Sequence, residues 1–118
     1  MTLKEALDYC DTYKPNSITI ETKVIWITEV DKIVYNDILS RADENEYESP
    51  SYSAENQDAE LFTPSPYDGI YFYYLSAKID TINGEYGSYN NNIALYNSLL
   101  KDFAVYYRQN HRPKKWGA

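Results

Sequence analysis

The sequence predicts an all-α protein, a small bundle of about four helices that forms one domain. Apolar residues recur every three or four positions along four stretches, and short runs rich in Pro, Gly, Asn and Ser separate these stretches. A chain of 118 residues is long enough to bury a single core. Only four glycines and five prolines are present, which excludes a collagen-like or low-complexity chain.

The first helix is expected over residues 3–13. Thr2 and Glu5 have the spacing of a capping box, in which each side chain accepts a hydrogen bond from the other residue's backbone N–H. The apolar side chains that follow at helical spacing are Leu3, Ala6, Leu7 and Cys10. Pro15 ends the helix, because the residue before a proline disfavours the α conformation. Cys10 is expected to be a buried thiol and not a nucleophile.

The second helix is expected over residues 20–41, with Thr19 as its N-cap. Its apolar face contains Ile20, Val24, Ile27, Val34 and Ile38, and Trp26, Val30 and Ile33 widen that face. The many β-branched residues would also suit a strand. The helical spacing continues for more than twenty residues, which is too long for an ordinary strand, so a helix is predicted.

Residues 42–64 are predicted to form a long loop. Seven acidic residues and no basic residue lie between positions 43 and 60: Asp43, Glu44, Glu46, Glu48, Glu55, Asp58 and Glu60. With few apolar anchors, the part from 42 to 60 is expected to be exposed and mobile. Calcium binding is the alternative, but the regular ligand spacing and central glycine of an EF-hand loop are missing. A solvated loop is therefore favoured.

The third helix is expected over residues 66–83. Ser65 would be the cap, Pro66 would take the first helical position, and Gly84 would take the left-handed position after the last turn. Its apolar residues form two adjoining faces: Ile70, Tyr71, Tyr74, Leu75, Ala77, Ile79 and Ile82. Such a broad apolar surface predicts a helix packed between neighbours.

The fourth helix is expected over residues 86–110 and has the most regular pattern. Its apolar residues alternate steps of three and four: Tyr86, Tyr89, Ile93, Tyr96, Leu100, Phe103 and Tyr107. This heptad seam predicts nearly antiparallel packing against another long helix, with the seam tyrosines in the core. Tyr73 and Tyr106 lie off the main seams, and for these two a place in the core and a place in an interface both stay open.

Composition excludes several function classes. The net charge of −7 argues against a general nucleic-acid binder. A mean hydropathy of −0.64 and the lack of a long uncharged apolar run argue against a membrane span. The first ten residues contain no apolar signal-peptide core, so a cytoplasmic site of synthesis is expected. One cysteine, one histidine and no nucleotide-binding or hydrolase motif predict a protein that is not an enzyme and holds neither metal nor cofactor.

Charge is segregated along the chain. Residues 1–100 hold 6 basic and 17 acidic groups, a net charge of −11, whereas residues 101–118 have a net charge of +4. A basic end and an acidic body would steer identical copies into a head-to-tail ring. A cation near the C-terminus of the last helix interacts favourably with the helix dipole, which explains Arg108. It does not explain Lys114-Lys115-Trp116, which follow Pro113. The sequence thus divides into a helical domain, 1–111, and a tail, 112–118.

The tail and two tyrosines are the candidate partner-binding residues. They are Arg112, Pro113, Lys114, Lys115, Trp116, Tyr73 and Tyr106. A tryptophan in a short basic tail is costly to leave in water, which favours a groove on a partner.

Several stretches resemble small proteins from the head-morphogenesis region of prophages of Gram-positive bacteria. They are Thr2-Leu3-Lys4-Glu5-Ala6-Leu7, Lys14-Pro15-Asn16, Lys23 with Trp26-Ile27 and Glu29-Val30-Asp31, Pro64-Ser65-Pro66-Tyr67-Asp68, Tyr71 with Tyr74-Leu75 and Ala77-Lys78-Ile79-Asp80, Asn83-Gly84-Glu85-Tyr86, Tyr89-Asn90-Asn91, Tyr106-Tyr107 and His111-Arg112-Pro113-Lys114. The likeness covers nearly the whole chain except the acidic loop. Ile27 and Val30 depart from it conservatively, because leucines are usual there.

Such proteins are similar to the head–tail connector, or adaptor, proteins of tailed phages. The resemblance implies a helical bundle that assembles as a dodecameric ring beneath the portal, in the neck of the virion. It implies as partners a second copy of the chain, the portal protein, and a stopper or tail-completion protein, with DNA passing through without specific binding. The C-terminal tail would reach the portal. No catalytic motif comes with the resemblance.

The sequence also leaves a second function open, an acidic inhibitor that mimics DNA and occupies a host protein's nucleic-acid site. The acidic residues of 43–60 support this alternative, and the basic tail counts against it. A small enzyme that uses tyrosine or carboxylate chemistry ranks last on motif grounds.

Overall fold

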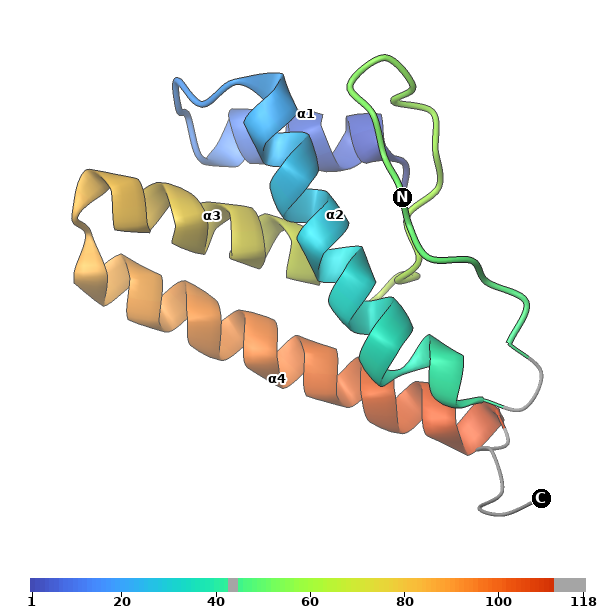
Figure 1. Cartoon of the computed structure of the whole chain (residues 1–118). Helices are drawn as coiled ribbons and strands as arrows, with labels where there is room; N and C mark the ends of the chain where they lie inside the picture. Colours follow the sequence, from blue (N-terminus) through green and yellow to red (C-terminus); the bar gives the residue numbers. More distant parts are fainter. Residues whose placement is uncertain (43–44, 112–118) are drawn as a thin grey trace.

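The computed structural model describes residues 1–42 and 45–111, which form four α-helices, one short 3-10 helix and no strand (Figure 1). The elements are α1 (Leu3–Tyr13), α2 (Ile20–Asp37), the 3-10 helix η1 (Leu39–Arg41), α3 (Gly69–Asn83) and α4 (Tyr86–Asn110). The prediction of a small all-α bundle is confirmed. No helix in the described part of the chain is long and apolar enough to cross a membrane.

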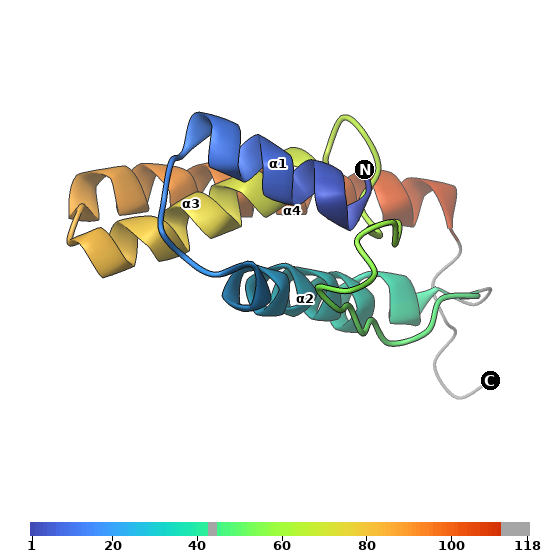
Figure 2. The ribbon, with the colours of Figure 1, turned by 90° about the horizontal axis from the view of Figure 1, so that it is seen from above.

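The helices lie in two layers. Helices α1, α3 and α4 form one layer, and α2 crosses the same side of all three as a second layer (Figures 1 and 2). The molecule measures 49 × 33 × 22 Å, so it is a flat body in which the core lies between the layers. Side chains from every helix line that core: Leu3, Leu7, Ile27, Val30, Val34, Ile70, Leu75, Ile79 and Phe103. The layer of α1, α3 and α4 therefore keeps an outer face that α2 does not cover.

The N-terminal caps of α1 and α2 are those that the sequence predicts. The Thr2 hydroxyl accepts a hydrogen bond from the Glu5 N–H at 3.2 Å, and the Glu5 carboxylate accepts one from the Thr2 N–H at 3.0 Å. The Thr19 hydroxyl accepts one from the Thr22 N–H at 3.2 Å. Each bond satisfies a backbone donor that the first turn of a helix leaves unpaired.

Helix α2 is shorter than predicted. It ends at Asp37, and the expected last turn is η1 instead, because Ile38 leaves the helical conformation (φ −123°, ψ −65°). Ile38 and Leu39 are both buried there, which this change of direction allows. The placement of Ile20 on the apolar face is also wrong, since its side chain is 44% exposed in the first turn.

Helix α3 begins at Gly69 and not at residue 66. The expected Ser65 cap does not form; residues 64–67 make a turn in which the Tyr67 N–H donates to the Pro64 carbonyl at 2.8 Å. The Tyr67 ring then packs on Phe103 of α4, with ring centroids 5.6 Å apart. Packing on a distant helix thus overrides the local cap signal. Asp68 occupies the N-cap position without a side-chain cap.

Helices α3 and α4 form an antiparallel hairpin, as the heptad seam predicts (Figure 1). Gly84 ends α3 with φ +72°, the left-handed conformation that glycine adopts without strain. A side chain at Gly69 would lie 3.1 Å from Leu99 of α4, so glycine permits this close approach. Tyr96 and Tyr107 are buried in the core as expected, and Tyr89 is half-buried.

The seam prediction is wrong at the turn of the hairpin. Tyr86 is 71% exposed, and the expected apolar position Ile82 is 58% exposed. Both lie where the hairpin projects beyond α2, which therefore does not cover them (Figure 1). A heptad pattern places residues on one side of a helix, but only a neighbour makes that side a core.

The acidic loop has more anchors than predicted. The Leu3 and Lys4 N–H groups donate to the Ala59 and Gln57 carbonyls at 2.9 Å each, and the Leu61 N–H donates to the Met1 carbonyl at 3.0 Å. The Pro50 and Leu61 side chains are buried. The described acidic residues of the loop are exposed: Glu46, Glu48, Glu55, Asp58 and Glu60. The acidic side chains are thus exposed as expected, while backbone bonds at Gln57 and Ala59 and the burial of Pro50 give the loop anchors that the sequence does not indicate.

A fully buried carboxylate, Asp31 of α2, ties this loop to the core. Its Oδ2 accepts hydrogen bonds from the Tyr52 hydroxyl at 2.5 Å and the Phe62 N–H at 3.1 Å. Its Oδ1 accepts one from the Tyr71 hydroxyl at 2.6 Å, and that hydroxyl accepts one from the Thr63 N–H at 2.9 Å. The Asp31 carboxylate thus binds the loop at Tyr52 and again at Phe62, and it also binds Tyr71 of α3.

A second fully buried carboxylate, Asp80 of α3, contacts a lysine at the end of α1 and an asparagine of α4. Its Oδ1 lies 2.5 Å from the Lys14 Nζ at the end of α1, and its Oδ2 accepts a hydrogen bond from Asn92 of α4 at 2.8 Å. Nearby, the buried Lys23 of α2 donates to Asp11 of α1 at 2.6 Å. These ion pairs hold α1 against the rest of the bundle.

Candidate functional site

The two tyrosines that the sequence singles out lie on the layer of α1, α3 and α4. Tyr73 of α3 is half-buried, and Tyr106 of α4 is 43% exposed. The Tyr106 ring packs on Tyr67, with ring centroids 5.3 Å apart. Tyr73 and Leu99 both border Gly69, two residues beyond Tyr67. The structure therefore brings Tyr73 and Tyr106 into one surface through the start of α3.

Further aromatic rings extend this surface onto α1. The centroids of Tyr13 and Tyr9 are 4.6 Å apart, Tyr9 meets Phe72 edge-on at 5.1 Å, and Phe72 meets Tyr73 edge-on at 5.8 Å. Tyr9 is 47% exposed and Tyr13 is 64% exposed. We call this set the aromatic surface: Tyr9, Tyr13, Tyr67, Phe72, Tyr73, Leu99 and Tyr106. Three of its rings, those of Tyr9, Tyr13 and Tyr106, are exposed, and tyrosine combines an apolar ring with a polar hydroxyl, as is common in protein interfaces.

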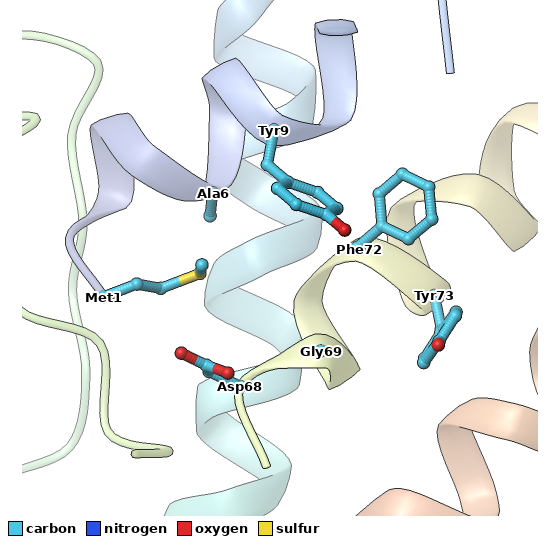
Figure 3. Close-up of a pocket in the computed structure, with 7 residues that line it drawn as sticks. All are labelled: Met1, Ala6, Tyr9, Asp68, Gly69, Phe72 and Tyr73. Atoms are coloured by element: carbon cyan, nitrogen blue, oxygen red, sulfur yellow. The ribbon is translucent and has the colours of Figure 1, made fainter. Parts of the chain in front are cut away.

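A cavity of about 150 Å³ opens within the aromatic surface at the start of α3. Met1, Tyr9, Phe72 and Tyr73 form its walls, and Gly69 and Asp68 border it (Figure 3). Helix α2 runs behind these residues in Figure 3, so the cavity lies on the outer face of the layer that α2 does not cover. An engineered cavity of about this size in another protein holds one benzene molecule, which sets the scale of a group that would fit.

One charged side chain, Asp68, borders the cavity. No lysine or arginine lines it, and no basic side chain among residues 1–42 and 45–111 forms an ion pair with Asp68. The Met1 ammonium lies 3.3 Å from Glu60 instead. Asp68 also precedes the first turn of α3, where a negative charge is favourable for the helix dipole. The cavity therefore combines aromatic walls with a single negative charge.

The remaining reactive groups do not form a catalytic arrangement. Cys10 is fully buried, and burial raises the pKa of its thiol to about 11, so the thiol is protonated at neutral pH. The His111 ring stacks on Tyr107 at 3.7 Å, and its Nδ1 lies 3.0 Å from the Tyr107 carbonyl. Within the described ranges, no three carboxylate, histidine or cysteine groups lie close enough together to hold a metal ion. Neither Cys10 nor His111 belongs to the aromatic surface.

Sequence reasoning missed Tyr9, Tyr13, Phe72 and Asp68. The sequence does indicate that Tyr9 and Tyr13 are neighbours on the surface of α1, because they lie four residues apart and outside its apolar face. Nothing in the sequence indicated that this pair would meet Phe72 on α3. The candidate residues of the tail, Arg112 to Trp116, lie outside the described residues, so the structure does not test them.

Comparison with protein-family models, curated proteins and solved structures finds no match to this chain. The geometry of the aromatic surface and the resemblance of the sequence stretches are therefore the grounds for a functional proposal.

Proposed function

We propose that this chain is a head–tail connector of a tailed phage, a structural protein and not an enzyme. Identical copies form a ring beneath the portal, in the neck of the virion, and link the head to the stopper and tail. The observation that carries the proposal is the aromatic surface, whose rings in the single chain are up to 64% exposed. Tyrosine-rich surfaces of this kind are typical of interfaces, because the ring is buried while the hydroxyl stays wet.

The distribution of charge supports a ring of identical copies. The first hundred residues have a net charge of −11 and the last eighteen have a net charge of +4. A basic end on one copy attracts the acidic body of the next, and such a head-to-tail contact closes into a ring when the rotation permits. The same charges would keep DNA phosphates from adhering to acidic parts of a channel wall.

Co-purification with a portal protein tests the proposal. The tagged full-length chain is expressed together with a phage portal protein, and native mass spectrometry measures the complex. We expect a species with about twelve copies of the 13.8 kDa chain bound to portal. The variant Tyr106→Ser is expected to lower recovery of portal at least tenfold, because it removes a ring from the aromatic surface.

Tyr86→Ser provides the matched control. Tyr86 is 71% exposed but lies at the turn between α3 and α4, outside the aromatic surface. The control is expected to assemble like the unaltered chain. A chain that stays monomeric at every concentration and recovers no portal protein would overturn the proposal.

One observation favours the second function, a DNA mimic. The exposed carboxylates of residues 46–60 lie along a loop whose backbone is bonded to the N-terminal residues at Gln57 and Ala59, which holds part of this negative surface in place. Recovery of a nuclease or polymerase from host lysate, with no virion protein, would reverse the ranking of the two functions. The charge-reversed loop variant Glu46→Lys/Glu48→Lys would then lose that partner, whereas a connector would keep its portal.

A further inference from the structure

We propose that the cavity at the start of α3 receives the C-terminal tail, residues 112–118, of a second copy of this chain. The inference rests on the proposed function and deepens it, since it names the contact that joins neighbouring subunits. The site is the cavity of about 150 Å³ between α1 and α3, bordered by three aromatic rings and one carboxylate. The ligand class is a short basic peptide that contains an aromatic side chain.

The cavity has the chemistry to bind a cation beside an apolar group. The rings of Tyr9, Phe72 and Tyr73 line the cavity, and aromatic rings attract a lysine or arginine that lies over their faces. Asp68 supplies a full negative charge, which no basic group of residues 1–42 and 45–111 pairs with. Met1 adds an adaptable apolar side chain to the wall (Figure 3). A neutral or acidic ligand would leave Asp68 uncompensated.

The tail matches these requirements. Residues 112–118 contain three basic residues, one tryptophan and no acidic residue. The cavity holds one group of about the size of benzene, so it takes one ring or one guanidinium at a time. Trp116 would fill it while Lys114 or Lys115 meets Asp68 at the rim. The tail is thus the segment of this chain whose charge is complementary to the cavity.

The direction of α4 favours the tail of another copy over the tail of the same chain. Helix α4 passes the cavity before it ends, because Leu99 borders Gly69 and Tyr106 packs on Tyr67. It then continues to Asn110, four residues and about 6 Å beyond Tyr106 at 1.5 Å per residue, before the tail begins. The tail of the same chain would have to reverse its direction along α4. A second copy meets no such constraint, and the repeated contact is head-to-tail.

A mixing experiment with two full-length variants tests the inference. The cavity variant Tyr9→Ser/Asp68→Asn keeps its tail, and the tail variant Trp116→Ser/Lys115→Ser keeps its cavity. Tyr9 is 47% exposed and asparagine is a good N-cap, so the cavity variant is expected to fold. In sedimentation velocity, each variant alone is expected to associate at least tenfold more weakly than the unaltered chain. Their equimolar mixture is expected to form one-to-one dimers and nothing larger, because one intact cavity and one intact tail remain.

Controls and a second measurement keep the test decisive. Tyr86→Ser, which changes an exposed tyrosine outside the cavity, is expected to associate normally. A synthetic peptide of residues 112–118 is expected to dissociate assemblies of the unaltered chain, and a peptide with glutamates in place of its lysines is not. If both variants associate normally, or if the mixture stays monomeric while the peptide has no effect, the inference is wrong. Protection of Trp116 from a fluorescence quencher at all dilutions would show that the tail binds its own chain, which also overturns it.

The outcome separates this inference from the proposed function. Rings of the tail variant that still recover portal protein would overturn the inference and leave the connector function standing. Head-to-tail association through the cavity with no portal recovery would support the inference and overturn the connector function.

Discussion

Asp31 and Asp80 are both fully buried carboxylates, but the structure neutralises them in different ways. Asp31 accepts hydrogen bonds from two tyrosine hydroxyls and one backbone N–H, all of them uncharged. Asp80 meets the Lys14 ammonium at 2.5 Å and the Asn92 amide at 2.8 Å. The first region joins the long loop to α2 and α3, and the second joins α1 to the hairpin of α3 and α4.

The two environments shift the pKa of the carboxyl groups in opposite directions. Burial raises the pKa of Asp31, and the hydrogen bonds from Tyr52, Tyr71 and the Phe62 N–H offset only part of that shift. Burial also acts to raise the pKa of Asp80, but hydrogen bonds from Lys14, Ser88 and Asn92 outweigh it and hold the pKa below its ordinary value. The comparison shows that Lys14, together with the Ser88 and Asn92 hydrogen bonds, more than offsets the effect of burial on the pKa of Asp80, whereas the uncharged donors around Asp31 do not offset it.

The largest expected effect is at Asp31. Asp31→Ala leaves the two hydroxyls and the Phe62 N–H without their acceptor in a site that water does not reach. We expect it to lower the free energy of unfolding by about 4 kcal/mol, measured by urea denaturation. Asp58→Ala, at an exposed position of the same loop, is the control and is expected to change it by less than about 0.5 kcal/mol. If Asp31→Ala and Asp58→Ala lowered the free energy of unfolding equally, Asp31 would not be the anchor of the loop.

A smaller loss is expected at Asp80. Lys14 is 22% exposed and lies 3.6 Å from Glu85, so after Asp80→Ala it still reaches a second carboxylate and water. We expect a loss of about 2 kcal/mol in the same urea measurement, because the Asn92 amide and the Ser88 hydroxyl also lose their acceptor. A loss larger than that of Asp31→Ala would contradict the comparison. Lys14→Met is expected to cost at least as much, since it leaves the Asp80 charge buried without a cation.

The pH dependence of the two Asp→Asn variants is expected to have opposite signs. The folded-state pKa of Asp31 lies above the ordinary 3.8, so its contribution is complete below that value and is lost as pH rises through the raised pKa. The folded-state pKa of Asp80 lies below 3.8, so its contribution is present above 3.8 and is lost as pH falls through the lowered pKa. The deficit of Asp31→Asn should therefore shrink above pH 3.8, and that of Asp80→Asn should shrink below it.

Urea midpoints of both variants and the unaltered chain between pH 2.5 and 7 measure this difference. Each unit of pKa shift corresponds to about 1.4 kcal/mol of stability, so changes of that order are expected. Deficits that move in the same direction for both variants would show that the two carboxyl groups are held alike.

The smallest expected effect is at Tyr52, which anchors the loop to Asp31. Tyr52→Phe removes one hydrogen bond, and two donors to Asp31 remain, so a loss of about 1 kcal/mol is expected. Hydrogen exchange should quicken at the backbone N–H groups of Leu3, Lys4 and Leu61, which are bonded to or lie next to the loop, and not in α4. Uniform acceleration throughout the chain would show that the loop does not open separately.

The sequence predicted the helices well wherever local chemistry decides them. The Thr2 and Thr19 caps, the end of α1 before Pro15 and the left-handed Gly84 are each governed by residues within a single turn. Predictions failed where a distant partner intervenes. Tyr67 packs on α4 and moves the start of α3 to Gly69, while Tyr86 lacks a neighbour and remains exposed. For the candidate site, Tyr73 and Tyr106 were named from the sequence, but Phe72 and the α1 ring of Tyr9 that packs on it were not.

The sequence by itself determined the fold class, the helix caps and the separation of charge, because these follow from the spacing of residues along the chain. The tertiary structure alone decided which carboxylates are buried and where a cavity opens. Asp31 and Tyr71 are 40 residues apart in sequence, yet their side chains lie 2.6 Å apart. Tyr9 and Phe72 likewise come from different helices and meet at the wall of the cavity. Periodicity shows which side of a helix is apolar, whereas a site depends on how helices distant in sequence pack together.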